Sequence, residues 1–172
     1  GTYVLQLSAS DGSLTSTDTV TVVVMASGVN SVFEKRIAAG NDDAEESSSG
    51  TMNLTHSTLE LVTDTTVQTV GFYFSGLNIP PGAKITNAYM QFKTAKKTTT
   101  ATSLVIRAQA SANPVSFTTI ARNISSRIRS VASVSWSPAA WNVVGEAGVN
   151  QRTTNLGAVV QEIVNQPGWA IG

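Results

Sequence analysis

The sequence predicts an all-β protein with one short amphipathic helix near its C-terminus. Apolar and polar residues alternate over several short stretches, which is the pattern of half-buried strands. Charged residues make up only 13% of the chain. Together with many Ser, Thr and Val residues, this composition is typical of strands joined by polar turns. Only one stretch carries an apolar stripe with the 3.6-residue period of a helix.

Residues 1–24 are predicted to form two strands. The first alternation is carried by Tyr3, Leu5, Leu7 and Ala9, and the second by Val20, Val22 and Val24. Asp11-Gly12 marks the connection between them as a turn. Because a lone hairpin is only marginally stable in water, the two strands require partners. Residues 25–32 are small and polar, and are predicted to be a linker.

Residues 33–172 are predicted to form a second, longer β-domain. Its first feature is an acidic, Ser-rich stretch at 41–50, which we expect to be a loop. The prolines and glycine at 80–82 predict a turn. Strands are predicted around residues 59–62, 70–74, 88–92, 104–108 and 131–136.

The predicted helix lies close to the C-terminus. Its apolar stripe consists of Leu156, Val159, Val160, Ile163 and Val164. Thr154 or Asn155 can cap its start, and Pro167-Gly168 ends it. We expect this helix to cover one end or one face of a β-sandwich.

Composition excludes several classes of function. The 11 basic and 11 acidic residues give a formal net charge of zero, so no excess of Lys and Arg is available for nucleic acid or an anionic membrane. With no cysteine, the chain has neither disulfides nor thiolate sites. No apolar run is long enough to insert into a membrane.

The sequence also predicts that the chain is not an enzyme. His56 is the only histidine, no nucleophile motif accompanies it, and we expect an exposed or hydrogen-bonded surface side chain. Four glutamates could in principle supply a carboxylate pair for glycoside hydrolysis, but structural salt bridges are favoured for them. They are Glu34, Glu60, Glu146 and Glu162.

Residues 1–24, GTYVLQLSASDGSLTSTDTVTVVV, resemble the last two strands of a PKD-like or cadherin-like immunoglobulin-type repeat. Such repeats are strung along bacterial surface proteins. The resemblance covers this tail only, and it implies that the rest of that domain precedes the chain.

Residues 33–172 resemble DNRLRE-type jelly-roll modules, which are carbohydrate-binding modules of large secreted bacterial proteins. The likeness is carried by NDDAEE (41–46), LELV (59–62), TVGFYF (69–74), IPPGAKITNAYMQF (79–92), ISSR (124–127), SVSWSPAAW (133–141) and LGAVVQEIVNQPGW (156–169). It implies a jelly-roll β-sandwich in an extracellular or cell-surface protein, with further strands beyond residue 172. Two positions depart from the family pattern, which tends to carry Arg in place of Tyr73 and Asp in place of Thr58.

The acidic stretch is a candidate structural calcium site. Calcium takes six to eight oxygen ligands, and clustered carboxylates commonly supply them. The alternative is a solvated loop, or salt bridges to arginines at 107, 122, 127 or 129. The candidate ligands are Asn41, Asp42, Asp43, Glu45 and Glu46, with Asp64 as a further possibility.

Aromatic side chains are the candidates for stacking on sugar rings, because a flat ring can cover the C–H face of a pyranose. Trp141, Tyr73 and Tyr89 are selected, whereas Trp136 and Trp169 are expected to be core residues. The sequence therefore predicts a non-catalytic module that binds polysaccharide or a cell-surface glycan. The alternative is a structural or adhesive fibre segment, whose open strand edges are completed by neighbouring copies or domains of the same protein.

Overall fold

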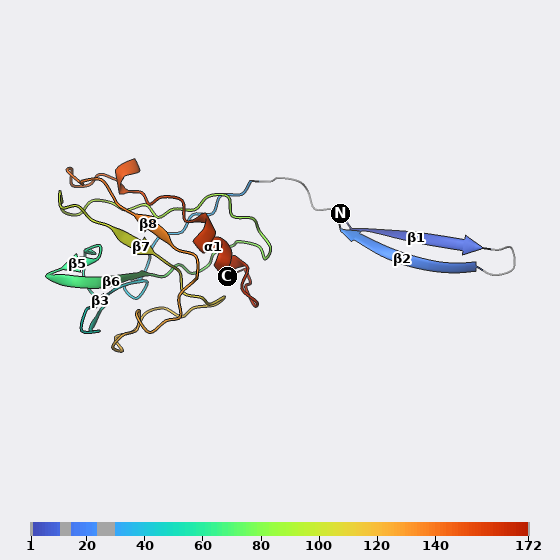
Figure 1. The fold of residues 1–172 in the computed structure, drawn as a ribbon, viewed down its shortest axis with the longest axis horizontal. Helices are drawn as coiled ribbons and strands as arrows, with labels where there is room; N and C mark the ends of the chain where they lie inside the picture. The colour runs from blue at the N-terminus through green and yellow to red at the C-terminus, as the bar shows by residue number, and fades with distance from the viewer. Residues whose placement is uncertain (1, 11–14, 24–29, 172) are drawn as a thin grey trace. The chain divides into compact units, whose positions relative to one another are not determined.

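The structure is a computed structural model that describes residues 2–10, 15–23 and 30–171. The chain divides into two units, Gly1–Val32 and Phe33–Gly172. Both are built mainly from antiparallel strands, with one α-helix in the second unit (Figure 1). The predicted mainly-β fold is therefore confirmed.

The first unit contains one hairpin. Strands β1 (Thr2–Ser10) and β2 (Thr15–Val23) pair antiparallel, from Thr2 opposite Val23 to Ser10 opposite Thr15. This confirms the two predicted strands. The predicted turn at Asp11-Gly12, Val24 and most of the predicted linker lie outside the described residues.

The main sheet of the second unit has four strands in the order β4-β3-β6-β5. Their bounds are β3 (Asp43–Ser47), β4 (Met52–Asn53), β5 (Thr63–Asp64) and β6 (Thr66–Phe72). Strand β6 lies where a strand is predicted. The prediction of a loop at 41–50 is wrong for residues 43–47, which form strand β3. These acidic residues form an inner strand because β4 and β6 pair with its two edges.

A second sheet consists of β7 (Leu104–Ile106) and β8 (Val134–Trp136), as the alternation predicts. The strands predicted around 59–62 and 88–92 are not formed as regular strands. At 88–92 the backbone still pairs with the segment before the helix: Phe92 donates to the Gln151 carbonyl, and Thr153 donates to that of Met90. The amides of Ala88 and Met90 donate instead to side-chain oxygens, those of Asn155 and Thr153. The regular ladder of backbone hydrogen bonds is therefore interrupted.

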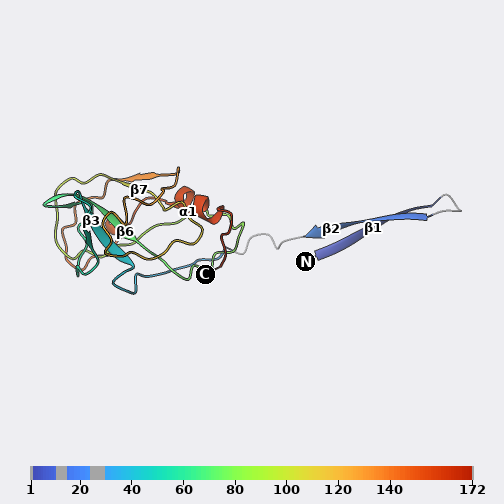
Figure 2. The same cartoon turned by 90° about the horizontal axis from the view of Figure 1, so that it is seen from below.

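Helix α1 (Gly157–Val164) confirms the predicted helix. The N-cap residue is Leu156 rather than the predicted Thr154 or Asn155, but Asn155, one residue earlier, accepts a hydrogen bond from the Gly157 amide at 2.7 Å. A 3₁₀ turn, η1 (Val149–Gln151), precedes it. Both views place α1 toward the opposite end of this unit from β3 (Figure 2). Among the described residues, no helix has the length and apolar character of a membrane span.

Apolar groups cover both faces of the main sheet. Neighbouring residues of a strand point to opposite faces, and Gly71 and Phe72 of β6 show this clearly. On one face Phe117 packs against Gly71, in a cluster with Ala44, Met52 and Ile124. On the other, the Phe72 ring lies 5.6 Å from that of Phe92, which stacks on Trp136. Apolar side chains therefore pack on both faces of the sheet.

Candidate functional site

Strand β3 places two buried carboxylates side by side in the sequence. Glu45 and Glu46 are each 3% exposed. Because successive side chains of a strand alternate, they point to opposite faces of the sheet. The two groups therefore meet entirely different surroundings.

Glu46 is held by backbone amides. Its Oε2 accepts hydrogen bonds from the amides of Ile124 and Ser125, both at 2.8 Å. Burial alone would raise the pKa of the Glu46 carboxyl, but the hydrogen bonds from Ser125 and Ile124 and the charge of Arg122 outweigh it, and the pKa is lowered. Glu46 thus anchors the segment around residue 124 to the sheet.

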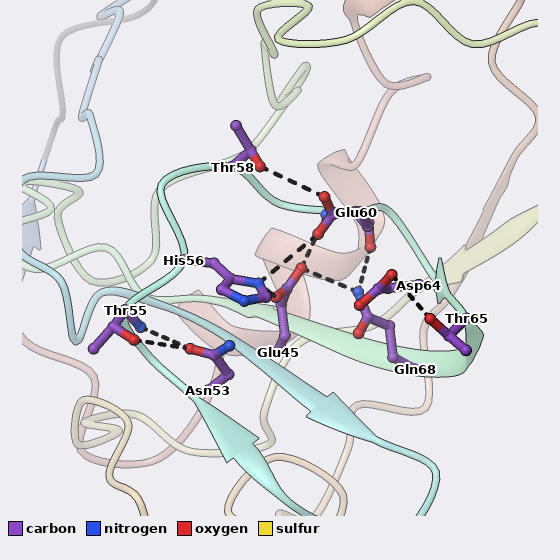
Figure 3. A network of polar contacts seen from close by, with 9 residues as sticks. All are labelled: Glu45, Asn53, Thr55, His56, Thr58, Glu60, Asp64, Thr65 and Gln68. Atoms are coloured by element: carbon purple, nitrogen blue, oxygen red, sulfur yellow. Dashed lines mark hydrogen bonds and ion pairs between the residues drawn. The ribbon is translucent and has the colours of Figure 1, made fainter.

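Glu45 belongs to a cluster of polar side chains (Figure 3). Its Oε1 accepts hydrogen bonds from the Glu60 amide at 2.9 Å and from Gln68 Nε2 at 3.0 Å. Its Oε2 lies 2.7 Å from His56 Nδ1. Gln68 Nε2 also donates to the Glu60 carbonyl at 2.6 Å. Gln68 therefore fixes both the Glu45 carboxylate and the backbone of Glu60.

The Glu60 carboxylate completes this cluster. Its Oε2 lies 4.0 Å from His56 Nδ1. That oxygen is buried and has no hydrogen-bond partner, whereas Oε1 receives only a 3.5 Å contact from the Thr58 hydroxyl. One ligand atom each from Glu45, His56 and Glu60 lie within 4.8 Å of one another. We call these three residues the Glu-His-Glu cluster.

A polar cavity of about 180 Å³ adjoins the cluster. Its lining consists of Glu45, Ser47, Thr51, Asn53, His56, Asp64 and Gln68. Val62 and Thr65 flank the short strand β5 and have φ values of 64° and 49°. β-Branched residues rarely occupy this left-handed region. The tight turn that Thr65 makes brings Asp64 to the cavity wall.

The structure does not bring the five predicted calcium ligands together. Asn41 donates to the Ser116 hydroxyl, and Asp42 accepts from the Ala39 amide. Glu45 and Glu46 lie on opposite faces, so one ion cannot contact both. Burial raises the pKa of Asp43 against a hydrogen bond from its own backbone, and the charges of Asp42 and Glu45 raise it further. Calcium binding itself stays a prediction.

Neither His56 nor Glu60 is among the ligands that the sequence predicts. His56 is hydrogen-bonded and 48% exposed, as expected for the lone histidine. The structure joins it to Glu45, eleven residues away, through the fold of the segment between β4 and β5. A histidine four residues before a glutamate is the only local signal, and outside a helix that spacing carries little information.

Of the four glutamates predicted to form salt bridges, only Glu60 lies within ion-pair distance of a basic side chain, His56, at 4.0 Å, and none pairs with Lys or Arg within residues 30–171. Within residues 30–171 the only ion pairs are those of His56. Glu162 instead accepts hydrogen bonds from the backbone amides of Val131 and Ala132, at 2.9 and 2.7 Å. For Glu162, backbone amides are therefore the hydrogen-bond donors, where a Lys or Arg side chain is predicted.

Most aromatic candidates are engaged in packing. Trp136 is 4% exposed, as predicted for a core residue. Trp141 is half-buried; its ring lies 6.2 Å from that of Phe92, and its Nε1 donates to the Asn150 carbonyl. Tyr73 packs against the cluster around Phe117. These contacts bury part of Trp141 and of Tyr73, and sugar stacking by either stays a prediction.

Tyr89 is different because its side chain is 47% exposed. The Arg152 guanidinium carbon lies 4.2 Å from the centre of its ring. Arg152 Nε donates to Gln91 Oε1 at 3.0 Å, and Gln91 Nε2 donates to the carbonyls of Phe92 and Gly148. An exposed ring, a guanidinium and an amide are thus held in fixed positions. We call Tyr89, Gln91 and Arg152 the tyrosine–arginine surface.

The second unit therefore offers two candidate sites, the tyrosine–arginine surface and the Glu-His-Glu cluster. The first suits a ligand with both apolar and hydroxyl groups, and the second suits a cation. No family model, no curated protein and no solved structure matches this chain.

Proposed function

We propose that this chain is a non-catalytic, extracellular binding module of jelly-roll topology, which attaches a larger secreted or surface protein of bacterial type to polysaccharide. One observation carries the proposal: the Tyr89 ring is 47% exposed, with the Arg152 guanidinium over one of its faces and Arg152 hydrogen-bonded to Gln91, so its other face is offered to a ligand. The mainly-β architecture and the sequence resemblance to carbohydrate-binding modules support it.

The tyrosine–arginine surface has the chemistry that sugar recognition requires. An aromatic face covers the C–H groups of a pyranose ring, while neighbouring polar groups bond its hydroxyls. Arg152 offers several N–H donors in a fixed plane. Because Gln91 is tied to two backbone carbonyls, little side-chain freedom is lost when a ligand binds. A site that binds without conformational change suits a module whose role is attachment.

The test is titration of the chain with a panel of neutral and acidic polysaccharides, followed by calorimetry on any that bind. Tyr89→Ala is expected to weaken binding at least tenfold, or ~1.4 kcal/mol. Phe33→Ala is the matched control, because Phe33 is also an exposed aromatic residue, at 43%. A folded chain that binds no member of a broad panel, or a Tyr89→Ala variant with unchanged affinity, would overturn the proposal.

A second candidate function is supported by the first unit. Within the part of the chain that the structure describes, β1 and β2 pair only with each other, and each is nine residues long. Long strands with open edges can pair with another chain. In this alternative the hairpin joins neighbouring copies into an adhesive fibre. Light scattering over a concentration series tests it, because a monomer at all concentrations would eliminate it.

A further inference from the structure

We propose that the Glu-His-Glu cluster binds one divalent transition-metal ion of the zinc class. Glu45, His56 and Glu60 would be its protein ligands. This inference is independent of the proposed function, because it uses neither the tyrosine–arginine surface nor a glycan.

The unpartnered oxygen of Glu60 points to a ligand. A buried carboxylate oxygen without a hydrogen bond is costly, so buried polar atoms are nearly always satisfied. Glu60 Oε2 is such an atom, and it lies on the side of the cluster where His56 Nδ1 and Glu45 Oε2 meet. A cation bound among these three atoms would satisfy it.

The charge of the cluster also favours a cation. Two carboxylates lie around one histidine, and carboxylates this close repel each other. No Lys or Arg of the described segments lies within ion-pair distance of the cluster. A bound dication would neutralise both carboxylates at once.

The geometry requires only small movements to accept the ion. Zinc holds nitrogen and oxygen ligands at about 2.0–2.2 Å, so tetrahedral ligand atoms stand about 3.4 Å apart. The present distances from His56 Nδ1 are 2.7 Å to Glu45 and 4.0 Å to Glu60. Binding would replace the hydrogen bond between His56 and Glu45 with two metal bonds. It would also draw the Glu60 carboxylate inward.

The surroundings already hold the first ligand in place. Metal-ligating groups are normally oriented by outer hydrogen bonds. Glu45 Oε1 is fixed by Gln68 and by the Glu60 amide, and Oε2 faces His56. Gln68 is therefore a positioning residue. The adjoining cavity gives access from solvent and leaves a fourth coordination position for water.

The donor set selects the class of metal. Imidazole nitrogen suits zinc, cobalt, nickel and copper, whereas calcium takes oxygen ligands almost exclusively. Three ligands, one of them nitrogen, are too few for calcium. We therefore expect calcium to bind here at least a thousandfold more weakly than zinc.

The experiment is calorimetric titration of the untagged, chelator-treated chain with Zn²⁺, Co²⁺ and Ca²⁺. The chain has one histidine and no cysteine, so zinc bound through an imidazole must involve His56. We expect one Zn²⁺ per chain with micromolar or tighter affinity, and a shift of the single imidazole NMR signal at the same stoichiometry. Zinc should also raise the melting temperature, because it binds the folded state.

Three variants locate the site. The side chains of His56 and Glu60 are both partly exposed, so replacing either by Gln should leave the fold intact. His56→Gln and Glu60→Gln should each weaken Zn²⁺ binding on the order of a hundredfold or more. Gln68→Leu should weaken it roughly ten- to a hundredfold by releasing Glu45. Glu34→Gln is the matched control, because it removes one exposed carboxylate elsewhere and should change nothing.

Circular dichroism shows whether each variant is folded before titration. The proposal is overturned if the folded wild-type chain binds no zinc or cobalt. It is equally overturned if His56→Gln binds zinc as tightly as the wild type, or if calcium competes at equal concentration.

Discussion

Two carboxylates of one strand, Glu45 and Glu46, are equally buried and yet have different surroundings. Glu46 has two backbone amides aimed at one oxygen and a lowered pKa, so its requirements are met by the fold itself. Glu45 shares its surroundings with another carboxylate, which keeps one buried oxygen without a partner. Both carboxylates are buried and hydrogen-bonded, so neither burial nor the number of partners separates them. What differs is the neighbour: Glu45 lies beside Glu60, whose Oε2 is buried without a partner.

The largest expected effect is on the Glu46 side. Glu46→Ala leaves the amides of Ile124 and Ser125 without an acceptor, and Ile124 is buried. We expect the free energy of unfolding to fall by about 3 kcal/mol. Urea denaturation measures it, with Glu34→Ala as a control that changes little. A loss below about 1 kcal/mol would contradict the structural role of Glu46.

A smaller effect should depend on pH. Glu46→Gln keeps the size of the side chain but loses the charge-assisted hydrogen bonds, at a cost of about 2 kcal/mol at neutral pH. Since the folded-state pKa of Glu46 is lowered, its contribution is fully present above the ordinary value of 4.5 and is lost as the pH falls through the lowered value. Wild type and variant should therefore converge in acid.

Denaturation curves from pH 7 to pH 2 test this convergence. Asp43→Asn is a useful comparison, because the pKa of Asp43 is raised, so the stability that its protonation provides is lost as the pH rises through the raised value. The two variants should thus alter the pH dependence in opposite directions. Parallel curves for wild type and Glu46→Gln would remove the electrostatic explanation.

The equivalent substitution on the other face of the sheet, Glu45→Gln, should hardly change the free energy of unfolding. In metal-free buffer, Glu45→Gln loses a charged partner for His56 but also removes the repulsion from Glu60. We expect a net change in unfolding free energy within about 1 kcal/mol. The same denaturation experiment measures it. A loss as large as that of Glu46→Gln would mean that both carboxylates are structural, and the comparison would fail.

The smallest effect concerns the backbone near each carboxylate. Thr65 and Arg122 have positive φ values of 49° and 62°. Thr65→Gly should stabilise the chain by about 0.5 kcal/mol, because relief of the left-handed conformation slightly exceeds the entropic cost of glycine. Arg122→Gly should not, because the Arg122 side chain covers Gly50 and its charge supports Glu46. Equal changes in melting temperature would contradict this difference.

The fold is predictable from the sequence where the signal is local. Alternation identifies β6, β7 and the hairpin, and the 3.6-residue period identifies α1, because each pattern reflects one buried face of a single element. The strand at 43–47 is not predictable in this way. Its two buried acids have partners far along the chain: Glu46 reaches amides 78 and 79 residues away, and Glu45 contacts side-chain and backbone groups 11 to 23 residues away.

The candidate sites show the same limit. Tyr89 is a sequence-based candidate, but its partner Arg152 comes from a distant segment. Glu45 is predicted as a metal ligand together with its neighbours in the sequence, because residue spacing shows nothing of its neighbours across the sheet. His56 and Glu60 join it only through tertiary contacts. Residue types could be chosen from the sequence, but their combination required the fold.

The side-chain acceptors that interrupt the pairing of residues 88–92 have a consequence for misassembly. The Met90 amide donates to the Thr153 hydroxyl, and the Ala88 amide donates to the Asn155 carboxamide. The position after Asn155 is Leu156, so a shift by one residue toward the C-terminus would leave the Ala88 amide without its side-chain acceptor, whereas Thr154 would still offer a hydroxyl in place of Thr153. A strand from another molecule without an amide side chain at that position would also leave the Ala88 amide without this acceptor. The Asn155 carboxamide therefore opposes slippage and exchange at this seam, which a uniform ladder of carbonyls could not do.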